Sequence, residues 1–164
     1  MGKKDELRKK DVTKLADSLL QQGFSQAFQT FLAEQKLFMT EVELAKKPVI
    51  LYFLKDNTPV LLVVGDTYIP TLQAYREFPD QPLPKIKVDA GAVQFMINGA
   101  DVMRPGMVEW DPFEEGQYVL IVNPMGHALS IGRAIISSEE MGEKGRVTKT
   151  LHHLNDDVWN FGAS

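Results

Sequence analysis

The 164-residue chain contains no cysteine and only three histidines, His127, His152 and His153. Without cysteine, disulfides, thiolate zinc sites, iron–sulfur clusters and thiol nucleophiles are all excluded. An all-histidine metal site would need every histidine of the chain. His152 and His153 are adjacent in a predicted strand, where neighbouring side chains point to opposite faces. The sequence therefore predicts neither a metal site nor a cofactor.

Long apolar runs are also missing. No run reaches the roughly 18 residues that a membrane-spanning helix requires, and the first thirty residues are too charged for a secretory signal peptide. We therefore expect a cytoplasmic protein. At 44% hydrophobic and 24% charged residues, a chain of this length can bury a core as one ordinary domain or as two small ones.

The chain has no excess of positive charge. Its formal net charge is -4, from 18 basic and 22 acidic side chains. Residues 1–84 carry 11 of each sign, whereas residues 85–164 carry 7 basic and 11 acidic side chains, which accounts for the whole net charge. Proteins that neutralise the phosphates of a long duplex usually carry a basic excess. Any contact with nucleic acid should therefore be a small local patch or a site that reads the shape and the chain ends of the nucleic acid.

Catalytic motifs are absent as well. The segment GEKGRVTK (142–149) lacks the spacing of a phosphate-binding loop, and GHALSIG (126–132) does not match the nucleophile elbow of hydrolases. No set of residues offers a nucleophile, a base and an orienting group together. The sequence thus predicts a protein that is not an enzyme.

The first half of the chain predicts two helices followed by strands. Apolar residues recur at helical spacing over 12–20, and Ser25 can cap a second helix whose apolar face carries Phe28, Phe31 and Leu32. Segments 48–54 and 58–64 are rich in β-branched and aromatic residues and predict a hairpin, and a short helix should follow Pro70. The segment FPDQPLP (78–84) contains three prolines. We therefore place a first domain at 1–78 and a linker at 79–84.

The second half predicts a small barrel. Strands are expected at 85–88, 100–107, 116–123, 127–137 and 145–154, with a helix over 89–99 that is capped by Asp89 and stopped by Gly99. A further short helix is expected to begin at Ser138. Short strands at this spacing favour a β-barrel over a βαβ sheet. The second domain should span 85–161, with a tail at 162–164.

A resemblance covers most of the chain. The segment VDAGAVQFMINGADVMRPGM (88–107) closely resembles the opening of a PUA domain, the RNA-binding module named after pseudouridine synthases and archaeosine transglycosylases. The segments YIPTL (68–72), HALSIG (127–132) and HHLNDDVW (152–159) resemble the malignant-T-cell-amplified-sequence proteins and their archaeal relatives. The resemblance implies an α+β protein in which a pre-PUA α+β domain precedes a C-terminal PUA β-pseudobarrel.

The resemblance also implies a function. Members of this family are non-catalytic RNA-binding proteins, so we expect this chain to engage structured RNA, either the acceptor end of tRNA or rRNA, in translation initiation or recycling. The implied partners are RNA, the small ribosomal subunit and a ligatin-like or density-regulated protein. Two alternatives remain open. The chain could be an RNA-binding accessory subunit of a tRNA or rRNA modification enzyme, or a protein adaptor that has lost RNA binding.

The family's RNA surface can be carried over residue by residue. It implies that the contact residues are Lys87, Asp89, Gly91, Ala92, Arg104, Pro105, Gly106, Lys149 and His152. Small residues at a helix start leave room for a sugar–phosphate backbone beside free N–H groups. Arginine can bind a phosphate through two N–H groups, and the lysines add point charges. Acidic residues near this face, Asp101, Glu109 and Asp111, predict weak binding that is reinforced by contacts elsewhere.

Overall fold

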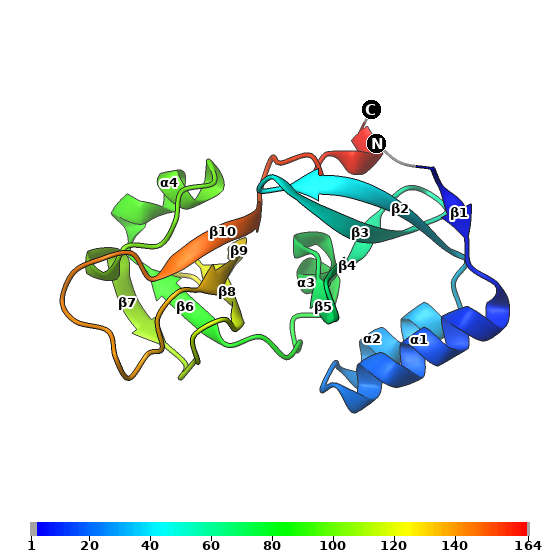
Figure 1. Cartoon of the computed structure of the whole chain (residues 1–164), viewed down its shortest axis with the longest axis horizontal. Helices are drawn as coiled ribbons and strands as arrows, with labels where there is room; N and C mark the ends of the chain where they lie inside the picture. The colour runs from blue at the N-terminus through cyan, green and yellow to red at the C-terminus, as the bar shows by residue number, and fades with distance from the viewer. Residues whose placement is uncertain (1–2, 164) are drawn as a thin grey trace. The chain divides into compact units, whose positions relative to one another are not determined.

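The structure is a computed structural model that describes residues 3–163 (Figure 1). These residues form two compact units, the first made of residues 3–82 and 157–163 and the second of residues 83–156. The division at 82/83 falls inside the predicted linker. The C-terminal segment differs from the sequence-based expectation, because the described residues after 156 belong to the first unit rather than to the second domain or a free tail.

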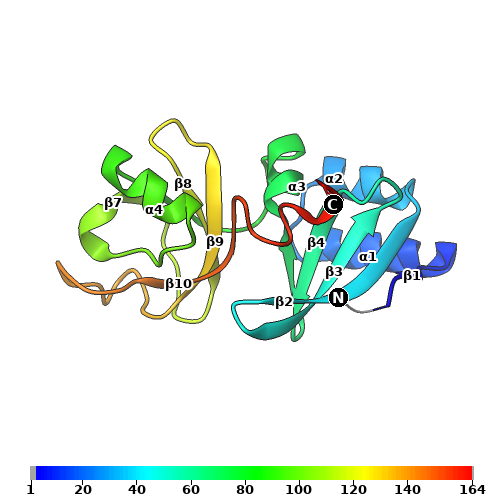
Figure 2. The same cartoon turned by 90° about the horizontal axis from the view of Figure 1, so that it is seen from above.

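The first unit combines an antiparallel sheet with three helices (Figures 1 and 2). Its strands follow the order of the chain: β1 (Asp5–Glu6), β2 (Leu37–Leu44), β3 (Lys47–Leu54), β4 (Pro59–Val64) and β5 (Thr67–Pro70). The helices are α1 (Lys9–Gln21), α2 (Gln26–Ala33) and α3 (Leu72–Glu77). Apolar residues of α1, α2 and α3 pack with residues of β2 and β4 in one core. None of the helices within residues 3–163 is long and apolar enough to cross a membrane.

Local signals account for the starts of α2 and α3. The hydroxyl of Ser25 accepts a hydrogen bond of 3.1 Å from the Phe28 N–H, which confirms the predicted cap of α2. Thr71 caps α3 in the same way through the Ala74 N–H. The predicted hairpin is present as β3 paired with β4. The hairpin formed by β2 and β3 was not predicted, and its turn places Ala45 and Lys46 in the left-handed region.

The C-terminal segment joins the first unit through specific contacts. The Phe161 ring lies 4.8 Å from the Phe53 ring, measured between centroids. The Gln73 side chain donates from Nε2 to the Trp159 carbonyl oxygen at 2.9 Å, and the Arg76 guanidinium lies 5.5 Å from the centroid of the Trp159 ring. These contacts to β3 and α3 explain why a segment that follows the last strand completes the core of the first unit.

The second unit is a five-stranded sheet with a short helical segment. Its strand order is β10 (Thr148–His153), β9 (Ala128–Ala134), β8 (Tyr118–Val122), β6 (Lys85–Val88) and β7 (Met107–Trp110). Strands β6 and β8 are parallel, and all other neighbours are antiparallel. A single turn of 3-10 helix, η1 (Ala90–Ala92), leads into α4 (Val93–Ile97). The core contains inward-facing residues from β6, β8 and β9 together with Met96 of α4.

Backbone hydrogen bonds close this sheet into a barrel. The segment just before β7 meets the segment just before β10, and these are the two outer strands of the sheet. Arg104 N–H donates to the Gly145 carbonyl at 2.8 Å, Val147 N–H donates to the Val102 carbonyl at 2.8 Å, and Met103 forms a β-bridge with Arg146. The second unit is therefore the pseudobarrel that the resemblance implied.

Two predicted elements are wrong. The segment 100–107 does not form a strand, since Arg104–Gly106 is a turn of 3-10 helix (η2) and β7 begins only at Met107. Proline fixes φ and donates no hydrogen bond, which suits the start of a helical turn and not a paired strand. No helix begins at Ser138. Its N–H instead donates to the Phe113 carbonyl, and its hydroxyl accepts from the Phe113 N–H at 3.0 Å.

A glycine pair tests the packing at the end of α4. Gly99 and Gly126 have nearly the same φ, +89° and +88°, but a Cβ at Gly99 would lie 2.7 Å from His153 Nε2, whereas open space surrounds Gly126. The His153 ring is held by Nδ1, 3.0 Å from the Ile97 carbonyl. We predict that Gly99→Ala lowers the free energy of unfolding by about 1–3 kcal/mol more than Gly126→Ala does. Urea denaturation of the full chain measures both, and equal losses would contradict the packing.

The start of η1 offers a second stability test. The Asp89 carboxylate accepts a hydrogen bond of 2.9 Å from the Ala92 N–H. We predict that Asp89→Ala costs about 1 kcal/mol of unfolding free energy, because this N–H loses its side-chain acceptor and keeps only the carbonyl of residue 89. Asp89→Ser keeps an oxygen that can accept the bond and should retain most of the stability. If the two variants lose the same amount in urea denaturation, the cap contributes nothing measurable.

Candidate nucleic-acid interface

An open pocket of about 390 Å³ lies on the second unit, between the start of η1 and the η2 turn. Five of the nine predicted contact residues line it: Asp89, Gly91, Ala92, Pro105 and Gly106. Asp89 N–H donates to the Gly106 carbonyl at 2.9 Å, and a Cβ added to Gly106 would lie 3.4 Å from the Ala92 Cβ. The structure thus places the predicted helix start and Pro–Gly turn side by side.

The helix start is less open to an anion than the sequence suggests. Gly91 is exposed, so no side chain blocks the approach to η1. The Ala92 N–H, however, is occupied by the Asp89 carboxylate and by the Asp89 carbonyl. A carboxylate at this position competes with any phosphate for the same amide. The expectation of free N–H groups is therefore not met at Ala92, and α4, at five residues, adds only a small dipole.

Arg104 is the cation best placed beside the pocket. Its guanidinium carbon lies 4.6 Å from the centroid of the Trp110 ring, and its backbone is fixed by the bond to Gly145. Stacking uses the face of the guanidinium and leaves its N–H edges to hydrogen-bond acceptors. Among the described residues, no carboxylate lies within ion-pair distance of Arg104. Arg104 is therefore a positioned positive charge without an internal acidic partner.

The two predicted lysines occupy different surroundings. Lys87 on β6 lies opposite Glu109 on β7, and its Nζ is 3.1 Å from the Glu109 Oε2. This ion pair balances part of the lysine's charge. Lys149 is exposed on β10 directly opposite Arg133 on β9, and it is not one of the residues that line the pocket. The Arg133 guanidinium is held by a bond of 3.1 Å from its Nε to the Gly116 carbonyl, so Lys149 is the freer of these two positive charges.

His152 does not belong to any exposed surface. Its side chain is 0% exposed, and its Nδ1 lies 2.7 Å from the Asp156 Oδ2. The register of β10 shifts between Thr150 and His152, and both Leu151 and His152 are buried as a result. A simple alternation along the strand cannot anticipate this bulge. The predicted contact role of His152 is therefore corrected to a structural one.

Two exposed apolar residues of the pocket were not among the predicted contact residues. Phe95 on α4 and Met103 before η2 both line it, with exposed fractions of 65% and 49%. The sequence grouped Phe95 with the apolar face of the helix, but only Met96 of α4 is buried. Five of the six residues over 92–97 are apolar, which is more than one helical face can bury. That excess was the available signal that one large side chain must remain outside.

Acidic groups complete the pocket. Asp101 lines it together with Asp89, but its carboxylate is already engaged, because Oδ1 accepts from the Thr150 N–H at 2.7 Å and Oδ2 lies 3.5 Å from the Arg146 Nε. No group of three histidine or acidic residues within 3–163 is arranged to hold a metal ion. The site is thus a mainly apolar pocket with two acidic residues, and Arg104, stacked on Trp110, lies on the adjoining η2 turn.

Comparison with known proteins identifies the family of the chain. Residues 84–154 match the family model of the PUA domain. An uncharacterized protein of Methanocaldococcus jannaschii is 39% identical over 66% of this chain and 68% of its own length. Translation machinery-associated protein 20 of Eremothecium gossypii is 32% identical over 79% of this chain and 83% of its own length.

A solved structure extends the likeness to both units. The crystal structure of a hypothetical protein from Pyrococcus horikoshii matches with a TM-score of 0.76 and 28% identity, and the match covers 98% of this chain and 99% of that one. The human malignant T-cell-amplified sequence 2 is 26% identical over 76% of this chain and 77% of its own length. The chain therefore belongs to the family of PUA-domain proteins that includes Translation machinery-associated protein 20 and the malignant T-cell-amplified sequence proteins.

Proposed function

We propose that this chain is a non-catalytic RNA-binding protein that engages structured RNA, either the acceptor end of tRNA or rRNA, during translation initiation or recycling. The names of the translation machinery-associated relatives support a role in translation. The observation that carries the proposal is the arrangement of Arg104, stacked on Trp110 and without an acidic partner among the described residues, beside a pocket with an exposed Phe95. The proposed contact surface comprises Lys87, Asp89, Gly91, Ala92, Phe95, Met103, Arg104, Pro105, Gly106 and Lys149.

The surface divides into groups that suit different parts of an RNA. The N–H edges of Arg104 bind a phosphate, and the exposed Lys149 adds positive charge outside the lining of the pocket. Phe95 and Met103 offer apolar area on which an unpaired base stacks. The Asp89 carboxylate accepts a hydrogen bond from the amino group of a base more readily than it tolerates a phosphate. The surface therefore fits the end or loop of a folded RNA better than a continuous duplex.

The charge balance sets the expected strength of binding. Acidic residues around the pocket keep nonspecific attraction to phosphates low, so the isolated chain should bind weakly and depend on further contacts with a ribosomal subunit or a partner protein. Ribosomal subunits that co-purify with the tagged chain would support the translation role. A modification enzyme recovered in their place would favour the alternative, an accessory subunit that presents tRNA or rRNA to that enzyme.

Reversal of charge at Arg104 tests the proposed surface. We predict that Arg104→Glu abolishes measurable binding to a tRNA with an intact acceptor end, and that the wild type shows a salt dependence of roughly -0.7 per phosphate contact. Fluorescence anisotropy at several salt concentrations gives both quantities. Lys47→Glu on β3 of the first unit makes the same change in net charge at another exposed site and should bind like the wild type. Unchanged affinity and salt slope in Arg104→Glu would reject the assigned surface.

Removal of the Glu109 carboxylate beside Lys87 should strengthen RNA binding. Glu109→Gln breaks the ion pair of 3.1 Å with Lys87 and leaves that ammonium available to RNA. We predict that the affinity for the same tRNA rises a few-fold, with little change in stability because the Glu109 side chain is largely exposed. Glu41→Gln on β2 is the matched control, since it removes one exposed acid from the first unit. An affinity that rises equally in both variants would show an effect of net charge and not of Lys87.

A further inference from the structure

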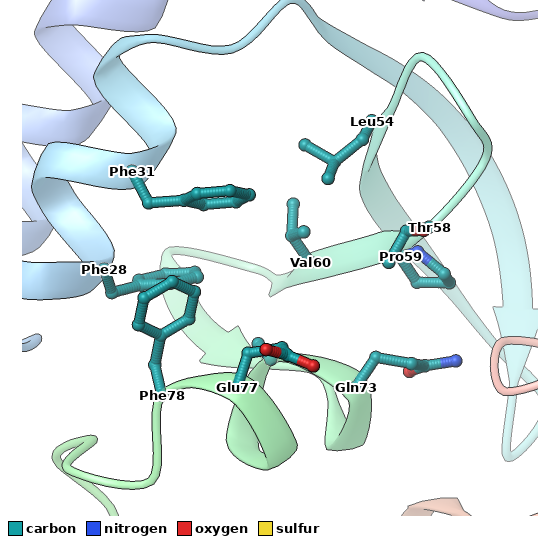
Figure 3. Close-up of a pocket in the computed structure, with 10 residues that line it drawn as sticks. Phe28, Phe31, Leu54, Thr58, Pro59, Val60, Gln73, Glu77 and Phe78 are labelled. Carbon is teal, nitrogen blue, oxygen red and sulfur yellow. The ribbon is translucent and has the colours of Figure 1, made fainter.

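A second pocket, of about 300 Å³, lies within the first unit and has no part in the proposed RNA surface. Helix α2, the β3–β4 loop with the start of β4, and helix α3 surround it (Figure 3). Phe28, Phe31 and Phe78 form one side, and Leu54 and Pro59 face them across the opening (Figure 3). This volume is at the lower end of the range for small-molecule sites, about 300 to 1,000 Å³. The pocket is therefore suited to one large side chain.

The aromatic side of this pocket is preformed. The Phe28 and Phe78 rings meet edge to face with centroids 5.5 Å apart, and the Phe31 and Phe78 centroids are 5.2 Å apart. Phe28 is fully buried in the core of the first unit, which fixes the position of the group. Phe31 and Phe78 are only partly buried, so their rings remain accessible from the opening. The apolar surface therefore needs no rearrangement to receive a ligand.

Two hydrogen-bond acceptors on α3 lie along the edge of the pocket. Gln73 and Glu77 are one helical turn apart and extend along the same side (Figure 3). Glu77 is the one charged residue that lines this pocket, and no cation of the described residues pairs with it. The bond from Gln73 Nε2 to the Trp159 carbonyl fixes which end of the amide is the oxygen. That oxygen is buried and has no hydrogen-bond partner within residues 3–163, which is costly.

We propose that this pocket binds a segment of a partner protein in which a large apolar side chain lies next to an arginine or lysine. The apolar side chain fills the space between the phenylalanines and Pro59, and the basic residue pairs with Glu77. The exposed Glu77 carboxylate calls for a ligand that brings a positive charge, and as the sole charged lining group it disfavours RNA because it repels phosphate. The proposal goes beyond the RNA-binding function and does not depend on it.

A charge swap at Glu77 tests whether the pocket binds a segment that carries a basic residue. Random peptides of about twelve residues, displayed on phage, are selected on the full chain, and the enriched sequences should place a large apolar residue within two positions of an arginine or lysine. Glu77→Arg should weaken the binding of a selected synthetic peptide by at least about tenfold, as measured by fluorescence anisotropy. Substitution of glutamate for the peptide's basic residue should restore binding to that variant. Glu41→Arg, which reverses an exposed carboxylate on β2, should leave the affinity unchanged.

Further measurements separate this proposal from the RNA-binding one. Nitrogen-15 NMR spectra should shift at residues around α2, α3 and the β3–β4 loop when peptide is added, and Arg104→Glu should bind the peptide like the wild type. The proposal is overturned if no peptide is enriched, if the enriched peptides lack a basic residue, if the spectral changes map elsewhere, or if Glu77→Arg binds as tightly as the wild type. Loss of RNA binding in Arg104→Glu without any effect on the peptide would show that the two sites are separate.

Discussion

The hydrogen bonds that join residues 102–104 to residues 145–147 are the constraint on which the second unit depends. They connect the segments that lead into the two outer strands, β7 and β10, and so convert an open sheet into a closed one. The same bonds hold the backbone of Arg104 and thereby the Pro–Gly turn that follows it. That turn lies against the start of η1 through the bond between Asp89 and Gly106. The candidate interface is thus built on the seam of the barrel, where rigid backbone positions the exposed side chains.

Local signals were sufficient for much of the fold. Ser25, Asp89 and Gly99 mark helix ends through hydrogen bonds or a positive φ that involve only nearby residues, and the sequence located all three. The segment 100–107 was misassigned because its alternating pattern suggests a strand, although its backbone finds partners more than forty residues away in the chain. The return of residues 157–163 to the first unit likewise rests on contacts with Phe53 and Gln73, which no local pattern contains.

The sequence predicted part of the candidate site, as it predicted part of the fold. The residues that shape the backbone, such as Gly91 and Gly106, lie around one pocket as the family resemblance implied. His152 could not be placed, because a bulge in β10 turns it into the core. The pairing of Lys87 with Glu109 depends on the register of two strands. Phe95 could have been found only from the excess of apolar residues on a short helix. Sequence patterns thus located the scaffold of the site better than its charges.

The placement of residues 157–163 has a consequence for the order in which the molecule can form. The second unit is one continuous stretch, residues 83–156, whereas the first unit is assembled from two pieces of chain that this stretch separates. During synthesis from the N-terminus, the barrel has all its strands before the earlier unit receives Trp159 and Phe161. The first unit is therefore synthesised first but completed after the second unit. Its nascent form exposes the apolar surface around Phe53 until residues 157–163 have been synthesised.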